Sequence, residues 1–340
     1  MDEGKGEGED QSERNGGKKN EWGEKYSRQI ILPEIGLEGQ RRINEAKVAI
    51  VGLGALGSVA AELLVRAGVG NLILIDRDVI EDSNLPRQAL YVEEDVGKSK
   101  VMAAKKRLQE INSRVKLEEY AIHLNYRNIN LLQQADIVLD CTDNLKTRFL
   151  INEYCKKEKK KWIYAATIKT KGYVMSIFPS GPCVECFLSE KVGETCDTSG
   201  VVNTITFSIA GLQVTEALKI IVGKEVESRL YYYDIWQPEM KQLQIPKNKN
   251  CLACQGEFRY LRGDDQEPMI KFCSSGRYQI LGKKVDLYVM RERWKMIGPV
   301  VDEGVALHFK NIILFADGRV LIKAKSEEEA RGTYSKWVGN

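Results

Sequence analysis

The sequence predicts a doubly wound α/β fold followed by a small α+β module. Near the start of the chain, a strand pattern, a glycine turn, a helix pattern and a second strand pattern follow one another. Strand and helix patterns then continue to alternate, and a hairpin signal lies close to the C-terminal end. The chain has 340 residues, which is enough for one large domain and one small one.

The glycine turn is the first feature that indicates a ligand. Residues 47–51 predict a buried strand, and residues 58–67 predict a helix whose first amides can face a phosphate. Between them lie Gly52, Gly54 and Gly57. The next strand, 71–75, ends at Asp76, about twenty residues past the turn, where a carboxylate usually binds a ribose hydroxyl. We therefore expect a nucleotide at this turn.

The remaining elements extend this pattern into a Rossmann-like mixed sheet, parallel at first and antiparallel later. We expect this domain to cover residues 23–262. Helices are predicted at 24–42, 101–111, 145–157 and 203–222, and strands at 117–121, 137–139, 162–166, 173–178 and in a pair around 231–240. Residues 1–22 are rich in Gly, Glu and Lys and cannot bury a core, so we expect a disordered tail.

Residues 265–340 predict the small C-terminal α+β module. The apolar runs 312–315 and 320–322 flank a turn at 316–319, which indicates a hairpin. Ser326 and Glu329 have the spacing of a capping box for a helix that runs to Trp337. We expect this module to recruit a partner or to pack a dimer.

The spacing of four of the eight cysteines predicts a zinc site. Cys183 and Cys186 form one C-x-x-C pair, and Cys251 and Cys254 form another. Four thiolates from two turns fill all four positions of a tetrahedral zinc ion, so this zinc would be structural. The alternative is two unrelated turns with unused thiols.

Composition excludes several other classes. The formal charge of +3 predicts no direct binding of nucleic acid, and we expect no apolar run long enough to span a membrane. The polar start of the chain lacks an apolar signal-peptide core, so we expect a cytoplasmic protein with reduced cysteines. The two histidines, His123 and His308, lie in no motif, and we expect structural roles for both.

Three stretches together closely resemble the MoeB/ThiF adenylyltransferase family, the ancestral relatives of ubiquitin-activating enzymes. They are residues 26–30, 76–100 and 140–144. The resemblance runs from about residue 26 to residue 254 and includes the four cysteines of the zinc site. Residues 97–99 look like the end of a P-loop, but the leading glycine would fall at Val92, so this is no Walker motif.

The resemblance implies ATP-dependent adenylation of the C-terminal glycine carboxylate of a ubiquitin-like sulfur-carrier protein that ends in two glycines. Pyrophosphate leaves, and a sulfur donor then supplies the thiocarboxylate. Molybdopterin (molybdenum cofactor), thiamine and tRNA-thiolation pathways all use this chemistry, and no residue here separates them. A carboxylate is already ionised at neutral pH, so the reaction needs no general base.

The family's site residues can be carried over to this sequence. Asp76 would hold the ribose, and Asn84, Arg87 and Lys100 would contact the triphosphate. Asp143 would hold magnesium, and Arg28 would reach the phosphates from the neighbouring subunit of a homodimer. Arg148 is a weaker candidate, because an arginine on a helix is most often a solvated charge.

The role of Cys196 stays open. It lies in a polar stretch bounded by Gly193 and Gly200, typical of a surface loop. In some relatives a cysteine of this loop accepts the acyl group or forms a persulfide-linked intermediate, and in others it is dispensable. Cys196 is therefore either catalytic or an unreactive surface thiol.

Three alternatives to the carrier reaction also stay open. The enzyme could adenylate another carboxylate, on a peptide or linked to tRNA. The glycine turn and Asp76 also support an NAD-dependent oxidoreductase, although the cationic segment that follows and the lack of a plausible catalytic histidine weigh against it. The third alternative is a catalytically idle scaffold that keeps the fold and the zinc while binding a partner.

Overall fold

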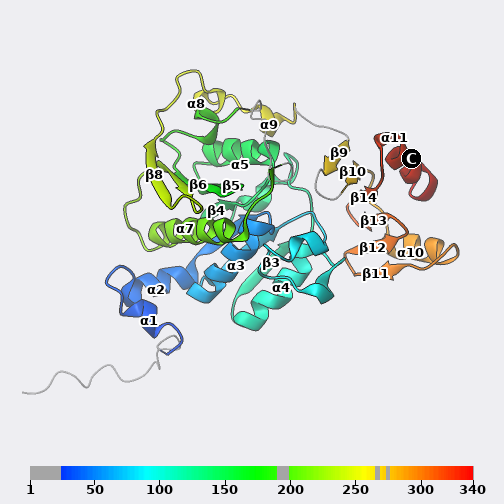
Figure 1. The fold of residues 1–340 in the computed structure, drawn as a ribbon, viewed down its shortest axis with the longest axis horizontal. Helices are drawn as coiled ribbons and strands as arrows, with labels where there is room; N and C mark the ends of the chain where they lie inside the picture. The colour runs from blue at the N-terminus through cyan, green and yellow to red at the C-terminus, as the bar shows by residue number, and fades with distance from the viewer. Residues whose placement is uncertain (1–23, 190–198, 265–268, 273–275, 340) are drawn as a thin grey trace, which may run out of the picture.

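The computed structural model of the chain describes residues 24–189, 199–264, 269–272 and 276–339 (Figure 1). Within these residues, one sheet has eight strands and a second sheet, in the C-terminal module, has six. The predicted fold class, a doubly wound α/β sheet with a small α+β module after it, is confirmed. The tail expected at residues 1–22 lies outside the described residues.

The eight-stranded sheet is parallel in its first half and antiparallel in its second, as predicted. Its strand order is β3-β2-β1-β4-β5-β6-β7-β8, with parallel pairing from β3 to β5 and antiparallel pairing from β5 to β8. The strands are β1 (Lys47–Val51), β2 (Asn71–Ile75), β3 (Lys116–Tyr120), β4 (Ile137–Asp140), β5 (Lys161–Ile168), β6 (Lys171–Ile177), β7 (Arg229–Asp234) and β8 (Glu239–Gln244).

Helices cover both faces of this sheet. In β1, Val48 and Ile50 pack into the core with α3, α4 and α7, whereas Ala49 and Val51 pack into the core on the α5 side. Successive side chains of a strand point to opposite faces, so both faces of β1 are buried and its sequence is continuously apolar. The helices are α1 (Ser27–Ile30), α2 (Gly36–Glu45), α3 (Ala55–Ala67), α4 (Lys100–Ile111), α5 (Leu145–Lys157), α7 (Asn203–Ile221), α8 (Leu252–Gln255) and α9 (Arg259–Arg262).

Two predicted helix boundaries were wrong. The helix expected over 24–42 is split into α1 and α2, because Pro33 disfavours helical backbone at the residue before it and Gly36 has a φ of +62°. The helix after the glycine turn begins at Ala55 rather than at residue 58, so Gly57 lies within its first turn.

The expectation that no apolar run could span a membrane was wrong for α7. This helix has 19 residues and a mean hydropathy of 1.2, which satisfies the length and composition of a spanning helix. In the fold, however, α7 packs against α3, β5 and β6, and its buried Gln213 donates to the main-chain oxygens of Asp140 and Ile163. The apolar residues of α7 therefore pack against the sheet and α3.

The C-terminal module is an antiparallel sheet in the order β11-β12-β13-β14-β10-β9, with two helices on one face. The predicted hairpin is confirmed as β13 and β14. The elements are β9 (Met269–Phe272), β10 (Arg277–Leu281), α10 (Leu287–Lys295), β11 (Val301–Asp302), β12 (Ala306–Phe309), β13 (Ile312–Phe315), β14 (Arg319–Lys323) and α11 (Glu327–Trp337).

The cap of α11 forms only half of the predicted box. Ser326 Oγ accepts a hydrogen bond from the Glu329 amide at 3.2 Å, as expected. The Glu329 carboxylate accepts from the Lys325 amide at 2.7 Å and not from that of Ser326. The amide bonded to the Glu329 carboxylate is thus one residue before the amide that a capping box would use.

Candidate functional site

The glycine turn brings the N-terminus of α3 to the carboxyl edge of the parallel strands. Gly52 has a φ of +91°, and a Cβ there would lie 2.6 Å from the Cys141 carbonyl oxygen. A Cβ on Gly57 would lie 1.8 Å from the Gly52 carbonyl oxygen, whereas one on Gly54 would meet its nearest atom at 3.8 Å. Gly52 and Gly57 are therefore required by the fold. The first amides of α3 face the edge where ligands of open α/β sheets bind.

Asp76 fixes the shape of this turn from the end of β2. Its carboxylate is buried and accepts from the Leu53 amide at 2.6 Å and from the Asp78 amide at 2.7 Å. Burial raises the pKa of Asp76, and the charge of Lys100 opposes that shift. Asp76, the residue predicted to bind the ribose, is thus hydrogen-bonded to the turn that would hold the phosphates.

Lys100 is a buried cation close to Asp76 and Asp78. It is the first residue of α4, and its Nζ lies 3.6 Å from a carboxylate oxygen of Asp78. Burial disfavours its charged form, but Asp78, Asp76 and Asp143 together raise the pKa of Lys100 above its ordinary value. It therefore stays charged, as its predicted contact with the triphosphate requires.

Asn84 and Arg87 lie in the turn between β2 and α4. Asn84 is buried, and its Oδ1 accepts from the Glu81 amide at 3.2 Å. Arg87 is half-buried and donates to the Ser83 carbonyl oxygen. In this structure both side chains therefore hold the turn together, and their predicted contacts with a triphosphate stay a prediction.

The expectation that Arg148 is a solvated charge was wrong. Arg148 is buried, and its Nε donates to the fully buried carboxylate of Asp140 at 2.7 Å. Its Nη2 donates to the main-chain oxygens of Thr142, at 2.7 Å, and Ala165, at 3.2 Å. The burial of Arg148 could have been predicted from Asp140. This acid ends an otherwise apolar strand, and a buried carboxylate needs a counter-charge.

Asp143 is exposed and acts electrostatically on both buried cations, Lys100 and Arg148. It follows β4, and its charge raises the pKa of both Lys100 and Arg148, although neither effect is the largest on its partner. The structure thus brings Asp76, Lys100 and Asp143 to one edge beside the N-terminus of α3 and adds Arg148 to them.

Arg28 lies apart from this group within one chain. It is exposed on α1, whose next residue, Gln29, donates to the Ala67 carbonyl oxygen at the C-terminal end of α3. The glycine turn lies at the other end of that helix, about 20 Å away for 13 residues. Cys196 lies outside the described residues.

The four cysteines meet on the α5 side of the sheet, as their spacing predicted. All four sulfurs lie within 4.8 Å of one another, with close pairs at 3.5 Å (Cys183 to Cys251) and 3.6 Å (Cys186 to Cys254). Sulfurs about 2.3 Å from a metal at the corners of a tetrahedron lie about 3.8 Å apart. The sulfur positions therefore fit a tetrahedral metal site.

Two neighbouring residues of α5 hold the cysteine turns in place. The side chain of Asn152 accepts from the Val184 amide at 3.2 Å and donates to Glu185 at 2.8 Å. The carboxylate of Glu153 accepts from the amides of Arg259 and Leu261 at 2.8 and 2.9 Å, beyond the second pair. One helix thus anchors the two distant segments that carry the cysteines.

Burial favours the protonated form of two thiols of this site. Burial raises the pKa of Cys183 and raises that of Cys251 to about 12. Burial also opposes ionisation of Cys186, but the amides of Cys183 and Asn248 lower its pKa overall. A bound cation would favour the thiolates, which are the ligating form.

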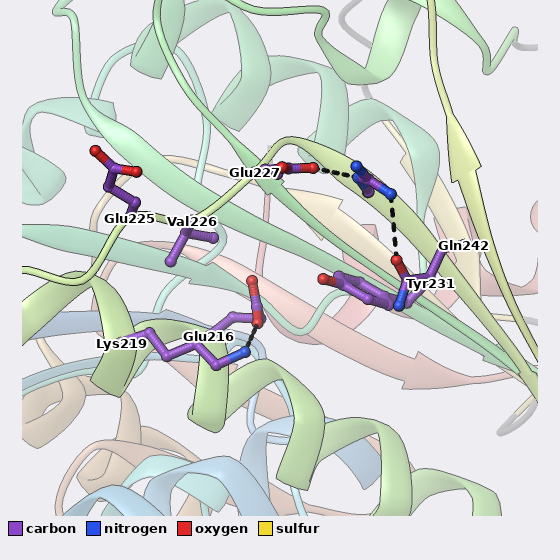
Figure 2. Close-up of a pocket in the computed structure, with 8 residues that line it drawn as sticks. Glu216, Lys219, Glu225, Val226, Glu227, Tyr231 and Gln242 are labelled. Atoms are coloured by element: carbon purple, nitrogen blue, oxygen red, sulfur yellow. Dashed lines mark hydrogen bonds and ion pairs between the residues drawn. The ribbon is translucent and has the colours of Figure 1, made fainter. Parts of the chain in front are cut away.

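A separate hollow of about 300 Å³ lies between α7 and strands β7 and β8 (Figure 2). Strand register places the start of β7 near the amino end of β5, so this hollow is on the edge of the sheet opposite the glycine turn. Four of its charged residues form two pairs: Lys219 contacts Glu216 at 2.8 Å, and Arg229 contacts Glu227. We therefore place the candidate site at the glycine turn.

Comparison with known proteins agrees with this placement. The model of the ThiF family matches residues 26–253. The sulfur carrier protein ThiS adenylyltransferase of Bacillus subtilis is 35% identical over 333 residues, which cover 93% of this chain and 99% of that protein. That match extends past the family model into the C-terminal module.

Two further similarities each cover about two thirds of this chain. The SAMP-activating enzyme E1 of Haloferax volcanii is 33% identical over 68% of this chain and 88% of its own length. The crystal structure of E. coli MccB with ATP has a TM-score of 0.58 and 25% identity, over 64% of this chain and 68% of that one.

Proposed function

Because the chain belongs to the ThiF family, we propose that it activates the C-terminal glycine carboxylate of a ubiquitin-like sulfur-carrier protein by ATP-dependent adenylation. It is an adenylyltransferase, as its named relatives are. The observation that carries the proposal is the gathering of Asp76, Lys100 and Asp143 beside the N-terminus of α3. The partner carrier and its pathway are not specified by these residues.

The reaction needs charge neutralisation more than proton transfer. A carboxylate oxygen of the carrier attacks the α-phosphorus of ATP, a new O–P bond forms, and the bond to the leaving pyrophosphate breaks. No proton is moved in this step, because the nucleophile is already an anion. Lys100, Arg87 and the first amides of α3 offset the repulsion between the two anions and hold the leaving group.

Magnesium and zinc have different places in this proposal. Magnesium, held by Asp143, would neutralise the triphosphate, and the exposure of Asp143 at the carboxyl edge supports this assignment. Zinc, held by Cys183, Cys186, Cys251 and Cys254, would be structural, because the protein fills all four coordination positions.

A homodimer would complete the active site. Arg28 lies at the far end of α3 from the glycine turn of its own chain, so it can reach ATP only from a neighbouring copy. The proposal also includes a sulfur donor that acts after adenylation, with Cys196 as the candidate acceptor, and a cytoplasmic location with reduced thiols.

The two histidines give no support to the hydride-transfer alternative. Burial, together with the neighbouring charges of Arg77 and Arg319, lowers the pKa of His123 to about 3. Burial also lowers the pKa of His308, which lies in the C-terminal module. Neither histidine is suited to donate a proton to a substrate.

Binding of ATP to the full-length protein tests the nucleotide site. Replacement of Lys100 by Met should weaken binding of Mg-ATP by at least about tenfold, the loss of one charged contact. Lys106→Met is the matched control, because Lys106 is an exposed residue of the same helix and should bind ATP normally. Equal affinity in the two variants would contradict the site.

A further inference from the structure

The inner face of the C-terminal sheet packs against the segment that carries the candidate nucleotide residues. Side chains alternate along β12, β13 and β14, so Leu307, Leu314 and Val320 pack with the helices of the module. The opposite face contributes Ile313, Phe315 and Leu321 to a separate apolar cluster with Val79, which follows β2. Figure 1 shows the module beside the cyan segment that follows β2.

Arg319 is the polar centre of this contact. It is fully buried, and its guanidinium lies 3.6 Å from the centre of the Phe315 ring. Nη1 donates to the Arg77 carbonyl oxygen, and Nη2 donates to the Ala121 carbonyl oxygen at 2.7 Å. Arg77 lies two residues past the end of β2, and Ala121 directly follows β3. One side chain of the module therefore ties the carboxyl ends of two parallel strands together.

The main chain held by Arg319 is part of the candidate site. Arg77 stands between Asp76, which accepts from the glycine turn, and Asp78, which pairs with Lys100. A shift of the Arg77 carbonyl would therefore move both acids and, through Asp78, the charge beside Lys100.

An ion pair between Arg277 and Glu81 holds the same segment a few residues further on. Arg277 of β10 donates through Nε to Glu81 at 3.0 Å, with both side chains mostly buried. The amide of Glu81 is the one that donates to Asn84 Oδ1. Arg277 thus fixes the turn that carries Asn84, independently of Arg319.

We propose that Arg319 and Arg277 are positioning residues for the nucleotide site, and that the C-terminal module completes this site by holding residues 76–84 in place. The inference rests on the proposed function, because it assumes that ATP binds at this edge. It gives the module a role in nucleotide affinity, in place of the recruitment or dimer packing expected from the sequence.

The first test replaces Arg319 by Met and by Lys in the full-length protein. Met keeps the stacking volume but removes the donors, so we expect the KM for ATP in ATP–pyrophosphate exchange to rise by about tenfold or more. Lys should recover part of the loss, and the KM for the carrier should stay unchanged. Arg331→Gln, on the exposed face of α11 in the same module, is the control.

The second test is a double-mutant cycle of Arg277→Gln, Glu81→Gln and the variant that carries both changes. These two side chains are partly exposed, so their variants should fold even if Arg319→Met does not. If Arg277 acts through Glu81, each single variant weakens ATP binding by several-fold and the double variant is no weaker than the worse single one. Losses that simply multiply would overturn the role of this pair.

The outcomes separate this inference from the proposed function. Failure of the wild-type protein to bind Mg-ATP would contradict the proposed function itself. The positioning role alone would be overturned by two results together. The wild-type protein would bind ATP in a way that depends on Lys100, and ATP affinity would be unchanged in folded Arg319→Met and in both single variants of the cycle. A purely stabilising module would lower the melting temperature of these variants and leave the KM for ATP unchanged.

Discussion

Arg148 Nε lies 2.7 Å from Asp140 Oδ2, and both side chains are buried at the carboxyl end of β4. The pair joins α5 to the strand, and Thr142 donates to the other oxygen of the same carboxylate through Oγ1, at 2.6 Å. The loop that leads to Asp143 therefore depends on an ion pair that is shielded from water.

Loss of Arg148 should be costly. Arg148→Met leaves the buried carboxylate of Asp140 without its counter-charge, and we expect a loss of roughly 3–5 kcal/mol in the free energy of unfolding. Denaturant unfolding measures this. Lys157→Met, on the exposed end of the same helix, is the control and should change stability by less than about 0.5 kcal/mol. Equal stability of the two variants would refute the importance of the pair.

Two helical glycines, Gly57 in α3 and Gly211 in α7, provide a matched comparison of packing. In Gly57→Ala the new methyl group would overlap the Gly52 carbonyl oxygen, so we expect a loss of about 1–3 kcal/mol in stability and weaker binding of ATP. In Gly211→Ala, in α7, the new methyl would meet no atom within 4 Å beyond the neighbouring backbone of its own helix, so we expect a gain of up to about 1 kcal/mol in stability. Thermal unfolding and ATP titration of both variants check this, and a stable, ATP-binding Gly57→Ala would be the contrary result.

The cysteine cluster should hold about one zinc ion per chain. Cys251→Ser removes one ligand, so we expect loss of bound zinc and a lower melting temperature. Cys155→Ala is the control, because Cys155 is equally buried but lies outside the cluster and should keep its zinc. Elemental analysis of the purified variants measures the metal. Full zinc occupancy in Cys251→Ser would show that the four thiols do not act as one site.

Acid should destabilise the protein through His123. Burial and the nearby Arg77 and Arg319 lower the pKa of His123 to about 3, compared with 6.5 when the ring is exposed. Between these two values the unfolded chain binds a proton that the folded chain does not, so stability falls as pH decreases from about 6.5 toward 3. His123→Gln should show a smaller fall over this range in pH-dependent unfolding. Parallel pH profiles for the two proteins would contradict this assignment.

Local patterns predicted the parts of the site that one segment builds alone. Gly52, Gly57 and Asp76 were found because strand, turn and acid follow one another in sequence, and the cysteines because each turn contributes two ligands. Arg148 was only a weaker candidate, and its burial was missed because it depends on Asp140, β5 and the loop after β4, which come together only in the folded chain.

The same reason explains what was missed in the C-terminal module. Arg319 was read as part of the turn at 316–319, whereas it begins β14 and faces the first domain. Both faces of β13 are buried, so its run of four apolar residues reveals a strand but not which side chains face which partner. Pairings between distant segments, such as Arg277 with Glu81, leave no periodic signal in the sequence.

The most direct test of the central claim is ATP–pyrophosphate exchange by the full-length protein with Mg-ATP and a panel of ubiquitin-like sulfur-carrier proteins. Each carrier is compared with a copy that lacks its terminal glycine. We predict exchange that depends on one carrier, disappears when that glycine is removed, and is lost in Lys100→Met but not in Lys106→Met. Exchange that is the same with intact and truncated carriers, or that is absent with every carrier, would contradict adenylation of a carrier terminus.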